Sequence, residues 1–151
     1  MPIKKSAQMN KLYLKKVVSI PEEENVMKAA KLMKLKNLGS LVVTNNKEQG
    51  SSPIGIITDR DIVVKAIANS KDLTQTKVKD IMSNHLITFK KNTAINEMLE
   101  TLAKKGVRRA PIVDENNNMC GIISTDDILT FIAEELNRIV DITFKQHTTV
   151  L

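Results

Sequence analysis

Two short motifs combine a hydroxyl with a carboxylate at a spacing suited to binding a nucleoside phosphate. Thr58 is followed three residues later by Asp61, and Ser124 is followed at the same spacing by Asp127. Each motif lies between a strand-like run and a helix-like run, where converging backbone N–H groups favour an anion and the carboxylate can accept hydrogen bonds from ribose hydroxyls. The same pattern is also that of a capping box, which satisfies only the helix's own backbone. The local sequence is compatible with both interpretations.

Catalytic and metal chemistry have weaker support. His85, His147 and Cys120 form no recognisable metal-ligand spacing, and the sequence contains neither a glycine-rich phosphate loop with a lysine nor a nucleophile elbow. Asp126 and Asp127 are adjacent, so a helix would point them to different faces. We therefore predict a protein that binds a ligand without catalysing a reaction and without a metal, with Cys120 as a small buried thiol in a strand.

The elements that must position the two motifs occur twice in the chain. Residues 17–45 match residues 86–114 at an offset of 69, and the segment around Thr58 matches the segment around Ser124 at an offset of 66. A repeat that fills the chain predicts two similar units packed about an approximate two-fold axis, with related pockets between them. Each unit has the pattern of a strand, a helix, two strands and a helix, so the predicted fold is α+β.

The predicted organisation has five parts. They are a basic arm at 1–10, a first unit at 11–69, a polar linker at 70–79, a second unit at 80–140 and a tail without an assigned structure at 141–151. Within the first unit, Pro21 and the three acids after it are expected to open a helix that ends near Asn37, because acids favour helix N-termini. A second helix is expected over 59–69, and the last helix is expected to end near Val140.

Taken together, these features resemble a tandem pair of CBS domains, the regulatory module named after cystathionine β-synthase. The resemblance rests on two β-α-β-β-α copies that each close on Gly-Ile-Ile-(Thr/Ser)-x-x-Asp-Ile, and on the run Asp-Ile-Met-Ser at 80–83; it covers roughly residues 11–140. It implies a free-standing regulatory protein that binds AMP, ADP or ATP between its units, with S-adenosylmethionine or a dinucleotide as less favoured ligands. It also implies a homodimer that acts on a downstream protein.

The resemblance assigns phosphate contacts to basic residues. It implies that Arg108 and Arg109 face ligand phosphates and that Arg109 reaches across the approximate axis toward Asp61. The first unit has Gly39 and Ser40 at the matching positions, so the two clefts are expected to differ, with tighter phosphate binding in the Asp61 cleft. For each arginine, an exposed ion pair worth about 0–1 kcal/mol is the alternative.

Further contacts are implied for the remaining cleft positions. Arg60 would partly compensate for the missing basic pair by reaching toward Asp127, where its counterpart in the second unit is the acidic Asp126. Three hydroxyl residues are implied to line the base, namely Ser83 and Thr88 in the Asp61 cleft and Ser19 in the Asp127 cleft. Each of these hydroxyls can equally be an ordinary residue at a strand edge.

The charge of the chain leaves a second function open. Lys and Arg number 23 against 17 Asp and Glu, a net charge of +6, and part of this excess makes the N-terminal arm basic. A nucleic-acid-associated protein that uses the CBS pair as a scaffold is therefore the alternative. One Tyr and no Trp leave almost no platform for stacked bases, which favours solubility as the role of the charge. Without a signal-like start or a long apolar run, we expect a cytoplasmic protein that makes no membrane contact.

Overall fold

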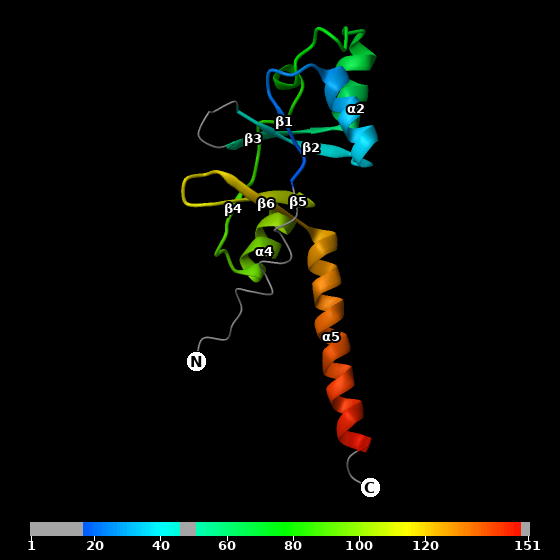
Figure 1. The fold of residues 1–151 in the computed structure, drawn as a ribbon, viewed down its shortest axis with the longest axis vertical. Coiled ribbons are helices and arrows are strands. Elements are labelled where there is room, and N and C mark those ends of the chain that lie inside the picture. The colour runs from blue at the N-terminus through cyan, green and yellow to red at the C-terminus, as the bar shows by residue number, and fades with distance from the viewer. Residues whose placement is uncertain (1–16, 46–50, 149–151) are drawn as a thin grey trace.

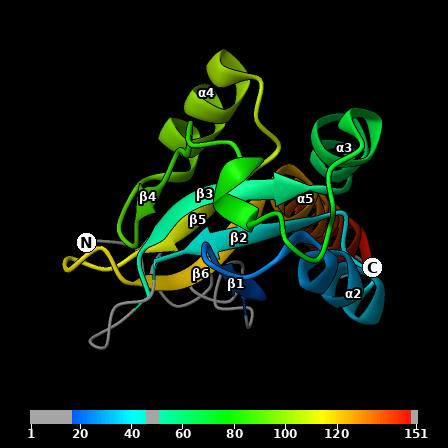
Figure 2. The same cartoon turned by 90° about the horizontal axis from the view of Figure 1, so that it is seen from above.

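The structure is a computed structural model that describes residues 17–45 and 51–148; the predicted basic arm lies outside this part. Two halves lie one above the other, and the helix α5 (Thr125–Thr148) projects from the lower half (Figure 1). Seen from above, the strands of one half cross over those of the other (Figure 2). The contact between the halves is therefore made by their sheets.

The first half contains a parallel pair of strands and an antiparallel pair. Its elements are β1 (Ser19–Pro21), α2 (Val26–Lys36), β2 (Ser40–Thr44) and β3 (Pro53–Thr58). The strand order is β1-β2-β3, in which β1 runs parallel and β3 antiparallel to β2. The apolar stripe of α2, Val26, Ala29 and Met33, recurs every three to four residues and is buried against this sheet.

The second half repeats this topology. Its elements are β4 (Phe89–Lys90), α4 (Ile95–Lys105), β5 (Arg109–Val113), β6 (Met119–Ser124) and α5. The strand order is β4-β5-β6, again with one parallel and one antiparallel pairing, and Met98 and Leu102 of α4 are buried in a second core. The predicted α+β fold of two β-α-β-β-α units is confirmed.

Equivalent backbone hydrogen bonds mark the repeat. The N–H of Asp59 donates to the carbonyl of Gly39 at 3.0 Å, and at the matching place the N–H of Thr125 donates to the carbonyl of Arg108 at 2.8 Å. These bonds tie the start of the helix after each hairpin to the start of the hairpin's first strand. The two motifs of the sequence are therefore held in the same local geometry in both halves.

The predicted start of the first helix was wrong by several residues. The helix α2 begins at Val26, and the side chain of Asn25 caps it by accepting a hydrogen bond from the backbone N–H of Lys28 at 2.8 Å. Asparagine is among the strongest N-caps, and the three acids precede this cap rather than lie in the first turn of the helix. The backbone N–H of Glu24 instead donates to the carbonyl of Pro21 at 3.1 Å in a turn.

The helical segment after β3 is less regular than predicted. It consists of one α-helical turn, α3 (Asp59–Asp61), a π-helical stretch, η1 (Ile62–Ala66), and a 3₁₀ turn, η2 (Ile67–Asn69). The segment ends at Asn69 as expected, and Ser70 adopts the left-handed conformation with φ 53°. Single π-helical turns inside helices frequently occur at functional sites.

The predicted linker, residues 70–79, packs against the first half. The backbone N–H of Val26 donates to the carbonyl of Thr76 at 2.9 Å, so the linker extends the N-terminus of α2. A 3₁₀ turn, η3 (Val78–Asp80), then buries Val78, and Ile81 joins the same core. The segment 78–83, which we call the connecting segment, therefore completes the first core.

Gly55 in β3 permits the close approach of the connecting segment. A Cβ atom on Gly55 would lie 2.8 Å from the Sδ atom of Met82 and 2.8 Å from the carbonyl oxygen of Ser83. The backbones of Ser83 and Ile56 also exchange two hydrogen bonds, of 2.8 and 3.0 Å. A residue without a side chain is required where two backbones pass this closely.

The last helix is longer than predicted. It was expected to end near Val140, but α5 continues to Thr148 and includes most of the segment assigned as a tail. No glycine or proline interrupts residues 125–148, and apolar residues continue along it at helical spacing. The segment after Val140 contains β-branched residues and has no evident partner in the sequence, so the helix end was placed too early.

Candidate functional site

Both hydroxyl and carboxylate motifs form capping boxes. The Oγ1 atom of Thr58 donates to Asp61 at 2.8 Å and accepts from the backbone N–H of Asp61 at 3.1 Å. The Oγ atom of Ser124 donates to Asp127 at 2.7 Å and accepts from the N–H of Asp127 at 3.1 Å. An ionised carboxylate has about four acceptor sites, and at Asp61 the backbone N–H and the hydroxyl of Thr58 take two of them.

Lys65 engages the Asp61 carboxylate. Its Nζ atom lies 2.8 Å from Asp61 and donates to the carbonyl of Ile81 at 3.0 Å, so it also ties the cap to the connecting segment. Burial raises the pKa of Asp61, but the hydrogen bonds from Lys65 and Thr58 outweigh it and hold that pKa below its usual value. A ligand that binds Asp61 must therefore share or displace the lysine.

The two arginines of the basic pair point to different places. The guanidinium of Arg109 donates to the Oγ atom of Ser40 at 2.8 Å, although the resemblance implied a reach toward Asp61. Ser40 is the residue that matches Arg109 in the first half, so this bond joins equivalent positions close to the approximate axis. Arg108 is exposed and lies 3.5 Å from Asp126, which fits the surface ion-pair interpretation. The side chain of Arg60 is also exposed.

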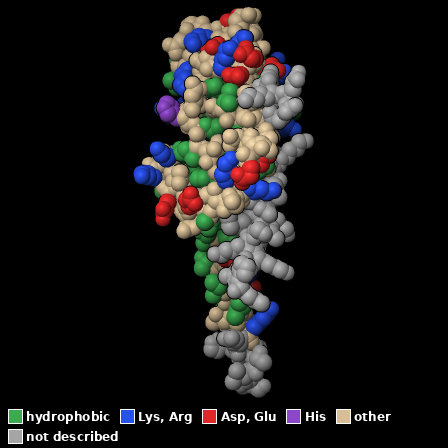
Figure 3. All heavy atoms as spheres, turned by 90° about the vertical axis from the view of Figure 1, so that its left-hand side faces the viewer, with side chains coloured by type: hydrophobic (Ala, Val, Ile, Leu, Met, Phe, Trp, Pro, Cys, Tyr) green, Lys and Arg blue, Asp and Glu red, His purple; other side chains and the backbone are tan. Residues whose placement is uncertain are grey.

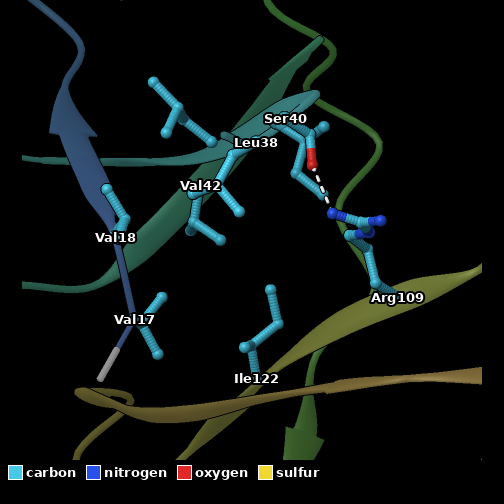
Figure 4. A pocket seen from close by; sticks show the side chains of 9 residues that line it. Val17, Val18, Leu38, Ser40, Val42, Arg109 and Ile122 are labelled. Atoms are coloured by element: carbon cyan, nitrogen blue, oxygen red, sulfur yellow. Dashed lines mark hydrogen bonds between the residues drawn. The ribbon is translucent and has the colours of Figure 1, made fainter. Parts of the chain in front are cut away.

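A cavity of about 180 Å³ lies between the halves beside the bond from Arg109 to Ser40. Its walls are mostly apolar, and Figure 4 shows Val18 and Val42 from the first half and Ile122 from the second half around the hollow. Arg109 and Ser40 form its polar edge. Clefts that enclose drug-sized ligands measure about 300–1,000 Å³, so a ligand of that size would fit into this cavity only in part.

Both caps lie one strand away from the polar edge of the cavity. Ser40 pairs with Thr58 across β2 and β3, and Arg109 pairs with Ser124 across β5 and β6. The start of the helix after each hairpin is therefore next to one end of the hydrogen bond between Arg109 and Ser40. The structure brings apolar walls from both halves and one guanidinium together, whereas Thr58 and Ser124 lie one strand away and neither capped carboxylate lines the cavity.

The three hydroxyls implied to line the base occupy different environments. Ser19 is half-buried in β1, directly after the cavity-lining Val17 and Val18. Ser83 is half-buried and pairs through its backbone with β3, whereas Thr88 is exposed just before β4. The described cavity thus lies on the side of Ser19, which the resemblance associates with the Asp127 cleft.

Several cavity residues were missed by the sequence reasoning. Ser40, which lines the cavity, was noted only as a departure from symmetry; Lys65, which binds Asp61 and is not part of the lining, was not considered. Ile56 and Ile122 stand two residues before Thr58 and Ser124 on the same strands, so strand alternation places them on the same sheet faces as the motifs. That period-two signal could have identified both isoleucines as walls of the site.

Other chemistry-bearing groups lie apart from the cavity. Cys120 donates to the carbonyl of Ile112 at 3.4 Å, and burial raises the pKa of its thiol. Within residues 17–45 and 51–148, His, Cys, Asp and Glu do not gather in groups of three or more that could hold a metal ion. In the same part of the chain, every helix is too short or too polar to cross a membrane.

The fold and the site define a module of two repeated units that share one hollow, so that neither unit forms the site alone. The sequence pattern of the CBS domain matches residues 9–67 and again residues 78–134, and the chain belongs to this family. An uncharacterised protein of Methanopyrus kandleri is 34% identical over 125 residues, which cover 83% of this chain and 62% of that protein. The CBS domain-containing protein YhcV of Bacillus subtilis is 35% identical over 112 residues, which cover 74% of this chain and 76% of YhcV.

Solved structures share the same architecture. The CBS domain pair of protein MJ0100, in complex with 5′-methylthioadenosine and S-adenosyl-L-methionine, superimposes with a TM-score of 0.68 at 25% identity and covers 82% of this chain and 97% of that one. A hexameric CBS-CP12 protein from bloom-forming cyanobacteria superimposes with a TM-score of 0.65 at 33% identity, over 80% of this chain and 68% of that one. Proteins with this fold therefore include a ligand-bound pair and an oligomer.

Proposed function

We propose that this protein is a cytoplasmic regulatory module that binds an adenosine-containing ligand between its two CBS units, with AMP, ADP and ATP as the first candidates. The observation that carries the proposal is the apolar cavity shared by both halves, with the guanidinium of Arg109 at its edge. The walls suit an adenine base, and the guanidinium suits a phosphate. The binding of two adenosine derivatives by the related pair MJ0100 supports this ligand class.

The charge at the cavity edge favours nucleotides over S-adenosylmethionine. Arg109 presents a permanent positive charge, which attracts the phosphate of AMP and repels a sulfonium cation. Charge-assisted hydrogen bonds are roughly twice as strong as neutral ones. Binding would be reversible, and the ligand level would shift the shape of the protein or its affinity for a downstream partner only if the two states bind the ligand differently.

Titration calorimetry with AMP, adenosine and S-adenosylmethionine tests this proposal. Arg109→Ala should weaken AMP binding by about 10- to 150-fold, the range expected for a lost hydrogen bond to a charged group, and should change adenosine binding much less. Arg108→Ala is the matched control, since that arginine is exposed and contacts Asp126. Equal losses for AMP and adenosine, or no binding of any of the three ligands by the wild type, would contradict the proposal.

The proposal includes a homodimer. In the stretches 62–64 and 128–132, Ile62 and Ile128 are buried in the two cores, while Val63, Val64 and Leu129 remain 50% or more exposed. Exposed apolar surface of this extent is typical of association between subunits, and a two-fold dimer would cover it on both copies. The hexameric relative supports self-association as a property of this fold.

A further inference from the structure

The projecting part of α5 carries a continuous apolar stripe. Leu129 is 67% exposed, Ile132 41%, Leu136 57%, Ile139 60% and Val140 47%. Figure 3 shows hydrophobic side chains in a row down this helix, below the body of the molecule. A stripe of this size on a helix that has left the core is not explained by the fold of one chain.

The spacing of the stripe is that of a helix that pairs with another helix. Leu129, Ile132, Leu136 and Ile139 follow one another at intervals of three, four and three residues, and Thr143 continues the series. This is a period of 3.5 residues, which keeps one seam facing a partner helix along its length. The helix has 24 residues, so the seam can extend over most of about 36 Å.

The charges select the orientation of the partner. The first half of α5, residues 125–136, contains four acids and no base, whereas residues 137–148 contain Arg138, Lys145 and one acid, Asp141. Both bases lie on the face opposite the stripe, and Arg138 already pairs with Glu135 at 2.8 Å, so these charges act on a partner helix only at long range. At that range two antiparallel copies, which set the acidic half of each helix against the more basic half of the other, repel less than two parallel copies. Antiparallel packing also sets each helix dipole against the opposite end of its neighbour.

The opposite face of α5 argues against a lipid surface as the partner. It carries Glu134, Arg138, Asp141 and Lys145, which are two acids and two bases. Helices that lie on membranes have a polar face rich in lysine and arginine. A self-complementary stripe with mixed charge behind it fits a second copy of the same helix, because a two-fold contact presents identical surfaces to one another.

We propose that two copies of this chain pair through antiparallel α5 helices, with Leu136 of each copy packed against Ile139 of the other near the two-fold axis. This inference rests on the homodimer of the proposed function and places its contact on α5, where it covers Leu129 but not Val63 and Val64 of the first half; it does not depend on the ligand. In this arrangement the two bodies stand at opposite ends of the helix pair. The C-terminal part of each α5 then lies beside Leu129 and Ile132 of the other copy.

Light scattering at micromolar concentrations tests the pairing on the full chain, whose monomer mass is 16.9 kDa. Leu136→Glu should halve the mass of the assembly, because it places a charge in the seam. Ile142→Glu is the matched control, because Ile142 is 60% exposed, close to the 57% of Leu136, but lies away from the stripe. The assembly formed by this variant should have the same mass as that of the wild type. Circular dichroism of both variants checks that the body remains folded.

Disulfide trapping tests the orientation. In a Cys120→Ser background, a mixture of Ile132→Cys and Thr143→Cys chains should form mixed disulfides if the helices are antiparallel, whereas parallel helices would link each position only to itself. A wild type that is monomeric, with the stripe covered by its own residues 1–16 or by another partner, would overturn both the dimer and the helix pairing. An assembly whose mass survives Leu136→Glu would overturn the pairing alone.

Discussion

The first and second halves of the chain share strand order, strand directions and capping boxes, yet they differ on both sides of the cleft. Where the second half has Arg109, the first has Ser40, and the two side chains meet in one hydrogen bond. After its cap, the first half continues for eleven residues in α-, π- and 3₁₀-helical turns, whereas the second continues as one helix of 24 residues. The two halves therefore share a backbone topology but differ in the side chains at the cleft and in the helix that follows the cap.

The two caps differ in the residue four positions after the acid. Lys65 follows Asp61 and binds its carboxylate, whereas the matching position after Asp127 is Phe131. In the first half, Lys65 also links the cap to the connecting segment through the carbonyl of Ile81. The two halves therefore share a fold but differ in the side-chain contacts around their caps.

The largest expected effect tests whether the halves unfold together. Met33 of α2 and Leu102 of α4 occupy matching positions in the repeat and are both buried. Met33→Ala and Leu102→Ala should each lower the free energy of unfolding by about 2–5 kcal/mol, through lost burial and the cavity left behind. Urea denaturation should show one transition that shifts in both variants. Two transitions, of which each variant moves only one, would mean that the halves are independent.

Gly55→Ala should break a contact of the first half. The added Cβ would meet the backbone carbonyl oxygen of Ser83 at 2.8 Å, and overpacking of this kind costs about 1–3 kcal/mol. Gly39→Ala is the control, because its Cβ would meet only the end of the Asp59 side chain, at 3.3 Å. We expect denaturation midpoints to fall for Gly55→Ala and to change little for Gly39→Ala. Similar losses in both variants would argue against a specific role for the connecting segment.

Substitutions of Asp61 and Asp127 test whether the two clefts differ in phosphate binding. The sequence favoured tighter phosphate binding at Asp61, on the basis that Arg109 would reach it. The structure changes this expectation, because Arg109 contacts Ser40 beside a cavity on the Ser19 side and Lys65 already engages Asp61. Asp127→Asn should therefore weaken AMP binding by about tenfold, or about 1.4 kcal/mol, and Asp61→Asn by less. If calorimetry shows that Asp61→Asn causes the larger loss of AMP affinity, the sequence-based expectation of tighter phosphate binding in the Asp61 cleft would stand.

The smallest effect is on acid stability. Because the pKa of Asp61 is lower in the folded chain than the ordinary value of about 3.9, the folded state binds fewer protons, and the contribution of Asp61 is present above that value. It is lost as the pH falls through the folded pKa. Stability measured between about pH 5 and pH 2 should therefore fall more steeply for the wild type than for Asp61→Asn. With the exposed Glu100→Gln as the control, parallel curves for wild type and Asp61→Asn would contradict this assignment.

The repeat made the topology predictable from the sequence. Matching stripes such as Val26, Ala29 and Met33 in one copy identify a helix, and the same spacing in the other copy confirms it without any knowledge of contacts. The motif residues Thr58 and Ser124 could be placed at helix starts by the same reasoning. Their role could not be decided, because a cap and a ligand site use the same groups at the same spacing.

What the sequence could not supply depends on contacts between distant segments. Nothing local shows that Arg109 ends on Ser40, since the bond spans 69 residues and forms only when the sheets cross. The start of α2 was misplaced because three acids suggested an earlier N-terminus, while the cap of Asn25 decided it. The packing of Val78 and Ile81 on the first core was missed because Val78 was assigned to a polar linker and Ile81 to the start of the second unit.

The connecting segment has a consequence for synthesis of the chain. Since Val78, Ile81 and Met82 belong to the core of the first half, a nascent chain released only as far as Asn69 would still lack part of that core. Domains generally fold as units while they leave the ribosome. The first half can therefore close only after residue 83 has emerged, by which time the start of the second half follows directly behind. A cut placed in the apparent gap between the repeats would leave the first half without the residues that seal it.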